Sequence, residues 1–338
     1  AIANDILYIA TSDSGIDRID LSSSSWLGSW TSNNWLVSDT VVGLAVTPGW
    51  LHILGDQQVQ AYDTDILLFR SGHSLSDIGL TGSGASISAW PGDLERAPAS
   101  SMALVGDASG TLGRLLGQSP DGNMKVVSSP SIDDAEVTAI IDDGQQGEVW
   151  IASGSIINIM DKREGVWKAP IDISEYASNP GSISEITQDD DGWVWVGTTG
   201  KGALRFSSVD GTFFGHIQGL SSLHVTSMDF DANNDILVIG HQESGISLYS
   251  TGAESVIEIF TTSNGLDSDS IRDVATRFGV AYIATQEEGV MRIDLSGPTI
   301  IGSWQSLGAD NLEQTPVAVD GDTIYLGLTG LGVLIIDR

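Results

Sequence analysis

Four oxygen-bearing side chains in one acidic turn are the residues of this chain whose type and spacing best suit a metal ion. Asp229, Asp231, Asn233 and Asp235 occupy alternate positions of the run DFDANND. Carboxylate and amide oxygens at alternate positions of a turn can converge on a hard cation, as they do in calcium loops. The spacing therefore predicts a calcium site, and calcium is the one cofactor that the sequence suggests.

This run resembles the calcium loops of integrin-type propellers and the opening of an EF-hand loop. It departs from both because Asn234 stands where a glycine follows the third ligand, and no bidentate glutamate follows at the EF-hand position. The structural alternative is an ordinary turn between strands, since Asp and Asn bond their own backbone and tolerate left-handed φ. A second acidic run, Asp189 to Gly192, favours the turn interpretation more strongly, because its three adjacent acids point in different directions.

Other groups with catalytic chemistry are scattered along the chain. The histidines lie in different repeats, with no spacing typical of a metal site: His52, His73, His216, His224 and His241. Neither a Gly-x-Ser-x-Gly nucleophile motif nor a full phosphate-binding loop occurs. Pairs of carboxylates for glycoside hydrolysis carry no information in a chain with 45 acidic residues. These observations favour a protein that is not an enzyme, and they predict no catalytic residue.

The tryptophans divide into two groups by their surroundings. Three lie within strand patterns, where indoles are expected to wedge between neighbouring sheets: Trp150, Trp193 and Trp195. Four stand on more polar segments, where an exposed indole could stack on a sugar or contact a protein: Trp26, Trp30, Trp35 and Trp304. Packing between sheets is the structural alternative for this second group as well.

The elements that must position these residues form a repeat. An apolar strand that ends near a Gly or Ala and is followed by a turn recurs about every 45 residues, a period typical of propeller blades. The eight copies begin near residues 6, 51, 102, 149, 194, 236, 280 and 324: Ile6–Thr11, Leu51–Asp56, Met102–Asp107, Val149–Ser153, Val194–Thr198, Ile236–Gly240, Val280–Thr285 and Ile324–Leu328.

Each copy belongs to a group of four short strands. A second strand follows it and often ends in an acid, as in Gly15–Leu21 and Gly289–Leu295. A third, more polar and aromatic strand comes next, as at Ile66–Arg70. A further strand precedes the next copy, with no helical stretch between. This pattern predicts an all-β fold, a single β-propeller of four-stranded antiparallel blades over residues 1–338.

The number of predicted strands allows two ways of closing the propeller ring. Eight blades are favoured, with the first blade lacking its inner strand and the last lacking its outer one. In the seven-blade alternative, the strand Trp26–Thr31 completes the last blade and the first hairpin is left over. The irregular, glycine-rich segment Ser71–Ser101 is expected to form a protruding loop.

The repeats resemble those of the two-component-regulator propeller type, and more loosely other extracellular propeller repeats. The best match is QDDDGWVWVGTTGKGALRF at residues 188–206, followed by GQQGEVWIASG at residues 144–154. Gly219–Leu220 and Gly265–Leu266 match the Gly-Leu lead-in of these repeats. The resemblance implies a propeller that forms an extracytoplasmic sensing or binding domain. Since no kinase or DNA-binding module follows before Arg338, a sensing role would require a partner or a longer chain.

The formal net charge of −31, from 45 acidic and 14 basic residues, limits the partners. Such a negative field repels nucleic acid and anionic lipid, so neither is expected as a partner. The acidity itself predicts either adaptation to salt, which screens surface charges, or binding of cations. The lack of cysteine excludes disulfides and thiolate metal ligands, and no apolar run is long enough to insert into a membrane as a helix.

These observations predict a non-enzymatic, extracellular or cell-surface β-propeller that acts as a rigid scaffold for binding or assembly, with a protein or glycan partner. If the chain self-associates, the outer strand edges and the segment Ser71–Ser101 are the first places where contact is expected. The alternatives are a ligand-sensing propeller of a signalling system, which recognises a glycan or peptide, and a propeller hydrolase or lyase.

Overall fold

The computed structural model describes residues 1–23, 25–47, 49–69, 72–76, 80, 82–90, 102–107, 112–116, 125–127, 137–143, 147–161, 166–286, 289–304, 317–320, 323–328 and 332–337. These residues divide into two compact units, Ala1–Asp142 with Gly147–Pro170 (unit 1) and Asp143–Gln146 with Ile171–Arg338 (unit 2). The prediction of a single domain stays a prediction. No helix in the described part of the chain is long and apolar enough to cross a membrane.

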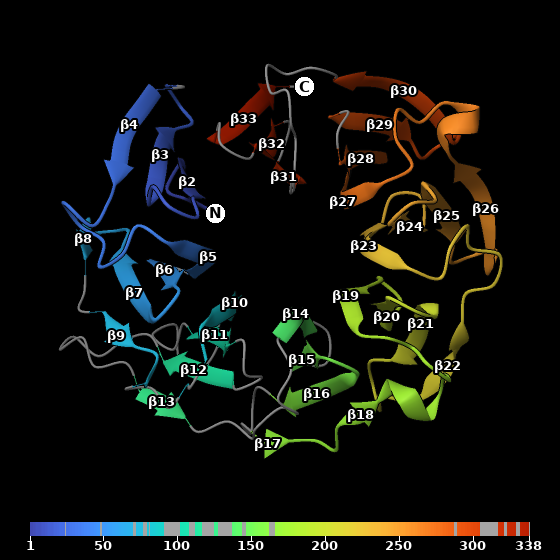
Figure 1. Ribbon diagram of the computed structural model, residues 1–338, viewed down its shortest axis with the longest axis horizontal. Helices are drawn as coiled ribbons and strands as arrows, with labels where there is room; N and C mark the ends of the chain where they lie inside the picture. The colour runs from blue at the N-terminus through green and yellow to red at the C-terminus, as the bar shows by residue number, and fades with distance from the viewer. Residues whose placement is uncertain are drawn as a thin grey trace. The chain divides into compact units, whose positions relative to one another are not determined.

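Unit 1 consists of antiparallel sheets whose strands follow one another in chain order (Figure 1). Its strands are β1 (Ile2–Ala3), β2 (Ile6–Ala10), β3 (Ile16–Asp20) and β4 (Ser25–Trp30); β5 (Val41–Thr47), β6 (Trp50–Gly55), β7 (Gln58–Asp63), β8 (Leu68–Phe69) and β9 (His73–Ser74); β10 (Gly84–Trp90), β11 (Met102–Asp107), β12 (Leu112–Leu116) and β13 (Lys125–Val127); and β14 (Val137–Asp143), β15 (Glu148–Ser153), β16 (Ile156–Asp161) and β17 (Val166–Trp167).

Unit 2 has the same organisation, with two short 3₁₀ helices, η2 (Ile173–Glu175) and η3 (Thr262–Asn264). Its strands are β18 (Ile171–Asp172); β19 (Ile183–Gln188), β20 (Trp193–Thr198), β21 (Gly202–Ser207) and β22 (Phe213–His216); β23 (Val225–Asp231), β24 (Ile236–His241), β25 (Ile246–Ser250) and β26 (Ser255–Phe260); β27 (Ile271–Arg277), β28 (Val280–Thr285), β29 (Val290–Asp294) and β30 (Thr299–Trp304); and β31 (Val317–Asp320), β32 (Thr323–Leu328) and β33 (Gly332–Asp337).

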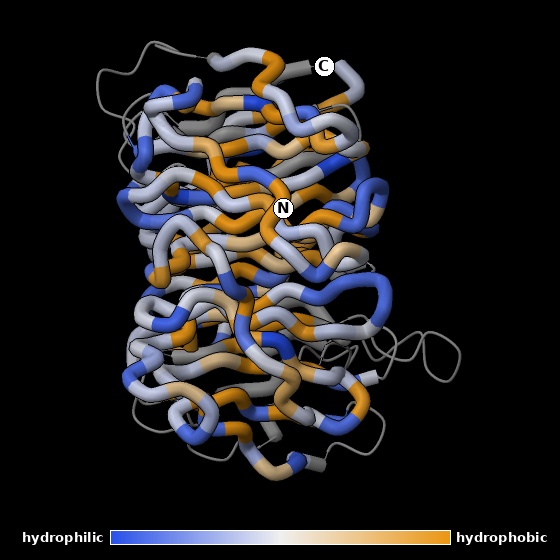
Figure 2. The backbone as a smooth tube through the Cα atoms, turned by 90° about the vertical axis from the view of Figure 1, so that its right-hand side faces the viewer, coloured by the Kyte–Doolittle hydropathy of each residue, from blue (hydrophilic) through white to orange (hydrophobic). Residues whose placement is uncertain are grey.

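The position of a strand within its sheet sets its burial. The second strands β24 and β28 are buried along their whole length, since neighbouring sheets cover both faces, and they are accordingly apolar. The fourth strand β26 is largely exposed. Figure 2 shows the same division, with apolar residues concentrated in the strands and hydrophilic residues in many of the turns. In unit 2 the first strands lie side by side, β23 against both β19 and β27. The fourth strands therefore present the accessible edges of this unit.

Glycine is required where the second strand turns into the third. Gly15 has φ of +84° and Gly245 has φ of +68°, a backbone conformation that costs a residue with a Cβ free energy. A Cβ on Gly245 would also lie 2.0 Å from the carbonyl oxygen of Phe260 in the fourth strand. The same clash, at 2.1 Å from the Trp30 carbonyl oxygen, would occur at Gly15. These turns therefore pack directly against the fourth strand of their own sheet.

The predicted strand pattern is confirmed, but the predicted blade set is wrong. When only described residues are counted, and only strands that belong to the same unit, six sheets are four-stranded blades: β1–β4, β10–β13, β14–β17, β19–β22, β23–β26 and β27–β30. The sheet β5–β9 gains a fifth strand, and the sheet β31–β33 has three. Neither eight nor seven four-stranded blades are present. The variation arises because the third strand of one sheet pairs with two short strands, β8 and β9, in place of one.

Two further expectations about the first sheet are corrected. It does have a first strand, since Ile2 and Ala3 of β1 pair with Leu7 and Ile6. The Trp26–Thr31 strand does not complete the last sheet, because β4 pairs with β3 of its own sheet. The segment Ser71–Ser101 lies partly outside the described residues, and its described part contains β9 and β10.

Candidate functional site

A row of three residues crosses the sheet β19–β22 and underlies the candidate site. Trp195 of β20 pairs with Arg205 of β21, and Arg205 pairs with Gly215 of β22. The pairing shifts by one residue beside Gly215, so Phe214 occupies a β-bulge. A bulge re-aims the side chain that it carries, and Phe214 is 59% exposed as a result. Arg205 thus stands opposite a glycine of the fourth strand, and the residue before that glycine carries an exposed aromatic ring.

The guanidinium of Arg205 is held by aromatic rings and by one carboxylate. Its central carbon lies 3.9 Å from the ring centroid of Trp193 and 5.2 Å from that of Trp195, distances that allow cation–π attraction. Nη1 donates to Oε1 of Glu254 at 2.9 Å. Glu254 belongs to the β25–β26 turn and takes a left-handed φ of +49°. The ion pair therefore connects two neighbouring sheets of unit 2 at their outer edge.

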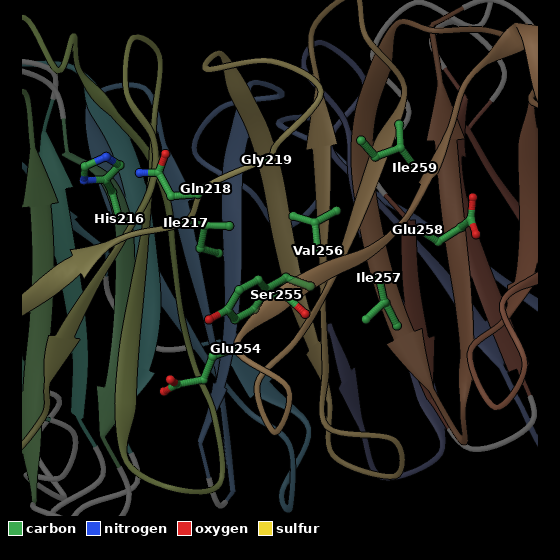
Figure 3. Close-up of a pocket in the computed structure, with 11 residues that line it drawn as sticks. His216, Ile217, Gln218, Gly219, Glu254, Ser255, Val256, Ile257, Glu258 and Ile259 are labelled. Atoms are coloured by element: carbon green, nitrogen blue, oxygen red, sulfur yellow. The ribbon is translucent and has the colours of Figure 1, made fainter.

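Two cavities adjoin at this ion pair and form one groove, here called the outer groove. The first has a volume of about 630 Å³ and lies between the end of β22 and β26 (Figure 3). The second, of about 290 Å³, reaches back to Trp195 and Arg205. They share His216, Ile217, Tyr249 and Glu254 in their walls. The combined volume is in the range that binds small ligands or a few residues of a peptide.

The walls of the outer groove differ in chemistry along its length. Figure 3 shows His216 and Gln218 on one side, and the β26 residues from Val256 to Ile259 on the other. Apolar side chains form the middle, whereas Glu254 and Glu258 stand toward its ends. Near Arg205, burial raises the pKa of Tyr249, so its hydroxyl stays a neutral donor at ordinary pH. The groove therefore offers an apolar floor with donors and acceptors at intervals.

The carboxylates predicted to bind calcium accept hydrogen bonds from the next sheet. Asp229 Oδ2 accepts from the backbone N–H and the hydroxyl of Thr276, at 2.6 and 2.9 Å. The two oxygens of Asp231 accept from Gly279 N and from the amide groups of Asn234, and Asp231 is only 2% exposed. Both acids thus act as connections between the sheets β23–β26 and β27–β30.

The other two predicted ligands lie in the turn after β23. Asn233 and Asp235 are both exposed, and Asp235 has a left-handed φ of +54° and a carbonyl oxygen that accepts from Thr251. The described residues contain no group of three or more histidine, aspartate or glutamate side chains that could hold a metal ion. The calcium site stays a prediction, which a thermal melt in calcium and then in chelator tests.

Three acids on the first strands of unit 2 influence one another. Burial raises the pKa of Glu185 to about 8, and the carboxylates of Asp273 and Asp229 add to the shift. Burial also raises the pKa of Asp273 and of Asp229, against the hydrogen bonds that each accepts. Asp273 Oδ2 accepts from Val317 N at 2.9 Å, the same kind of connection that Asp229 makes one sheet earlier. The row therefore serves sheet-to-sheet packing.

The acidic run, the histidines and the tryptophans that the sequence singled out lie in different surroundings. Asp189 is 4% exposed and accepts from Trp193 N and from the indole of Trp195, so the acidic run is a turn, as the structural alternative held. His52 and His241 are fully buried. Among the tryptophans, Trp26 and Trp35 are 69% and 56% exposed, whereas Trp30, Trp150 and Trp195 are buried. Of Trp304 only the backbone is described.

Comparison with known proteins agrees with this architecture. Residues 178–200, which include β19 and β20, match the family model described as two component regulator propeller. The chain is similar to the crystal structure of the computationally designed Ika8 protein, with a TM-score of 0.72, 12% identity and coverage of 100% of this chain and 95% of that chain. It is also similar to Sqt1 of Saccharomyces cerevisiae, with a TM-score of 0.77, 11% identity and coverage of 98% and 93%. No curated protein sequence matches it.

The fold is a β-propeller. The chain carries a regulator propeller repeat at residues 178–200, which confirms the resemblance predicted from the sequence. At 11% and 12% identity the similarity to solved structures shows the fold alone. The matched repeat supplies the first two strands of the sheet that carries Arg205.

Sequence reasoning missed the arginine row of this propeller, although a signal exists. The same aromatic–arginine–glycine row occurs in two other sheets, as Tyr8–Arg18–Gly28 and as Tyr282–Arg292–Gly302. In each case the arginine stands in the middle of the third strand and the glycine just after the bulge of the fourth. With only 14 basic residues in the chain, three arginines at one repeat position were a recognisable pattern.

Proposed function

We propose that this propeller is a non-enzymatic binding protein, extracellular or at the cell surface, which holds a segment of a protein partner in the outer groove. The groove is the observation that carries the proposal. It lies at exposed fourth strands, where a partner can reach it, and it is rigid, because two sheets and the Arg205–Glu254 pair form its walls. Rigid walls lower the entropic cost of binding.

The groove chemistry favours a polypeptide over a small polar molecule. Ile217, Val256 and Ile259 offer apolar contacts, while His216 and Glu258 can bond to backbone amides of a ligand. The edge of β26 also has main-chain groups that pair with no fifth strand among the described residues, so an extended segment can align with it. Its one arginine is paired with Glu254, which suits holding a ligand better than transforming it.

The test is a thermal-shift screen of the full chain with a library of synthetic peptides, followed by variants of the groove. A peptide that binds only the native state raises Tm, since stabilisation equals RT ln(1 + [L]/Kd). Phe214→Ser and Glu258→Gln are expected to weaken binding of that peptide about tenfold, because they remove a rim contact and the negative charge of an acceptor. Glu243→Gln, an exposed acid of the β24–β25 turn, is the matched control.

Binding that survives Phe214→Ser and Glu258→Gln would contradict the groove as the site. Turnover of any peptide or oligosaccharide by the wild-type chain would contradict the non-enzymatic role.

A second candidate is a ligand-sensing propeller of a signalling system. The match to the regulator propeller repeat favours it, because that repeat begins the sheet whose outer strand forms one wall of the groove. The two candidate functions differ in the ligand that the chain is expected to bind. A sensor is expected to respond to one class of free oligosaccharide or short peptide, whereas a scaffold is expected to bind a folded partner or a second copy, which light-scattering mass detects.

A further inference from the structure

Large apolar side chains are exposed more densely in one stretch of unit 1 than elsewhere in the described chain. Of fifteen exposed large hydrophobic residues, eight lie between residues 26 and 68. Seven of them belong to three segments, namely β4, the connection of residues 31–40, and the β7–β8 turn together with the start of β8. This surface, which we call the apolar edge, includes Trp26, Leu27, Trp35, Ile66, Leu67 and Leu68. Exposed apolar residues gathered in this way mark an interaction site.

Trp35 is not required by the backbone that carries it. The connection of residues 261–270 in unit 2 repeats the hydrogen bonds of residues 31–40, and it has Gly265 where unit 1 has Trp35. The buried residue that follows is leucine in both, Leu36 at 5% and Leu266 at 4% exposed. A large, 56% exposed indole at a position where glycine suffices is therefore an addition to the framework.

Leu67 is likewise unexplained by folding. It stands in the β7–β8 turn with a left-handed φ of +57°, which glycine or asparagine adopts at lower cost. The side chain is 64% exposed, with Ile66 at 60% before it and Leu68 at 47% after it. Backbone strain at Leu67, together with exposure of all three apolar side chains, points to a function outside the fold.

The three segments form one surface because Phe69 of β8 joins them. The Trp35 ring stacks on Phe69, with centroids 5.8 Å apart and planes at 7°. The buried Trp30 at the end of β4 contacts the same ring at 4.6 Å. Asn4 Nδ2 donates to the carbonyl oxygen of Thr64 at 3.0 Å, which ties the first sheet to the turn that carries Leu67.

The rim of this surface is acidic. Residues 1–69 contain eight aspartates and one basic side chain, Arg18. The guanidinium of Arg18 lies 4.6 Å from the ring centroid of Trp30 and donates to the Leu27 carbonyl oxygen. Each apolar segment has an acid beside it: Asp20 pairs across the strands with Ser25, Asp39 ends the connection of Trp35, and Asp65 precedes Ile66. The partner that complements this rim is positively charged.

We propose that the apolar edge binds a cationic segment of another protein, in which leucine-like anchors alternate with lysine or arginine. This surface is separate from the outer groove, so the proposal goes beyond the function proposed above. A second copy of this chain would bring the same acidic rim, and a net charge of −31 on each molecule opposes that contact. Aliphatic side chains such as Ile66 and Leu68 offer a sugar no hydrogen bonds, so the composition favours protein over glycan.

The probe is a synthetic amidated peptide of alternating leucine and lysine, titrated calorimetrically into the full chain. Its control has glutamate in place of every lysine. The leucine–lysine peptide is expected to bind, more weakly as sodium chloride rises, and the glutamate peptide is not. The double variant Trp35→Gly, Leu67→Gly is expected to lower the affinity at least about tenfold. Glycine adopts the φ of Leu67 at no steric cost, and glycine occupies the position that corresponds to Trp35 in residues 261–270, so the variant should fold.

The matched control is Val209→Gly, an equally exposed apolar turn residue of unit 2, which should bind like the wild type. A further measurement on the wild type needs no variant: the peptide should protect Trp26 and Trp35 from acrylamide quenching. The proposal is overturned if the glutamate peptide binds as well, if the double variant keeps its affinity, if the tryptophans stay unprotected, or if chito- or cello-oligosaccharides bind there and the peptide does not. Groove variants should leave all these results unchanged, which separates this proposal from the previous one.

Discussion

The connection after β4 and the connection after β26 have the same framework but differ at one exposed residue. Asn34 Nδ2 donates to a carbonyl oxygen of β4 at 3.0 Å, and Asn264 Nδ2 does the same in β26 at 2.8 Å. Asp39 and Asp269 each accept both the N–H and the hydroxyl of the second residue of the connection. Residues that recur with their bonds in this way are needed by the fold.

The difference between the two connections separates scaffold from function. Gly265 adopts φ of +124°, a conformation that glycine tolerates, while Trp35 has no left-handed φ and displays its indole. Departures from the repeat are therefore the places to look for a role. By this criterion Trp35 and His241 matter most, because each replaces what other sheets carry at the same position. Glu185 differs from Ser227 of the next sheet, whereas Asp273 keeps an acid at this position. Residues shared by the two connections should therefore have similar effects when they are replaced, and departing residues should not.

The largest effect is expected at the shared leucine. Leu36→Ala and Leu266→Ala each remove a buried side chain and leave a cavity, which costs about 3 kcal/mol of unfolding free energy. Because the frameworks are the same, the two losses should agree to within about 1 kcal/mol in denaturant titrations of the single variants. A much smaller loss for Leu36→Ala would show that the two connections are not equivalent.

His241 departs from Thr11, Thr198 and Thr285, whose hydroxyls donate to the glycine carbonyl that closes the same turn. His241 Nε2 instead bonds Ser247 Oγ at 3.0 Å, and burial lowers its pKa to about 4. As pH falls below 6.5 the unfolded state takes up the proton first, so stability is lost.

The expected loss at pH 5, relative to pH 8, is about 2 kcal/mol from this residue. His241→Thr should remove it, as seen in melts across pH. His52, whose pKa burial also lowers to about 4, should keep a similar acid sensitivity in that variant. An unchanged pH profile in His241→Thr would contradict this account.

Gly265→Trp should lower the free energy of unfolding more than Trp35→Gly does. Gly265→Trp forces a left-handed φ on tryptophan and places a Cβ 2.8 Å from Ile300, so it should cost about 2 kcal/mol. Trp35→Gly loses only a half-exposed stacking contact with Phe69 and should cost less than about 1 kcal/mol. Thermal melts of both variants decide this, and equal costs would mean that the indole serves the fold.

The smallest expected effect is the contribution of Glu185 to the pH dependence of the unfolding free energy. Its pKa, raised to about 8, lies above that of the unfolded chain, so the folded state keeps a proton that the unfolded state releases. Stability is therefore lost as pH rises from the ordinary glutamate pKa of 4.5 to about 8. About 1 kcal/mol of that loss falls between pH 7 and 9, given partial solvation of the group. Glu185→Gln should flatten this alkaline limb. Ser227, its counterpart in the next sheet, carries no such charge.

How much the sequence predicted depends on whether the deciding contacts are local. The strand Met102–Asp107 was predicted with its observed bounds, because apolar content and a following turn are properties of the segment itself. The third, polar strand of the second repeat was predicted at Ile66–Arg70, whereas the structure has a turn at Ile66 and Leu67 and a strand, β8, only at Leu68–Phe69. Arg70 lies outside the described residues. The Asp63 carboxylate accepts from Asp65 N and Ile66 N and stabilises that turn. Side-chain capping of this kind overrides β-propensity.

The candidate sites depend even more than the strands on contacts between residues that are distant in the sequence. The Asp229–Asp235 run was recognised as an acidic turn, but the donors that occupy its carboxylates, Thr276 and Gly279, come from the next sheet, 47 and 48 residues away. No local sequence pattern predicts these donors. The outer groove was missed because Arg205 meets Glu254 across 49 residues.

By itself the sequence determined the all-β propeller fold, the repeat of about 45 residues and the acidic character, because alternation, glycine turns and charge are local or additive properties. Only the tertiary structure decided which blades have four strands, that Trp30 is buried while Trp26 and Trp35 are exposed, and that a paired Arg205 and Glu254 form a groove. The reason is physical. Burial and pairing depend on which sheet packs against which, and those neighbours are brought together by folding from distant parts of the chain.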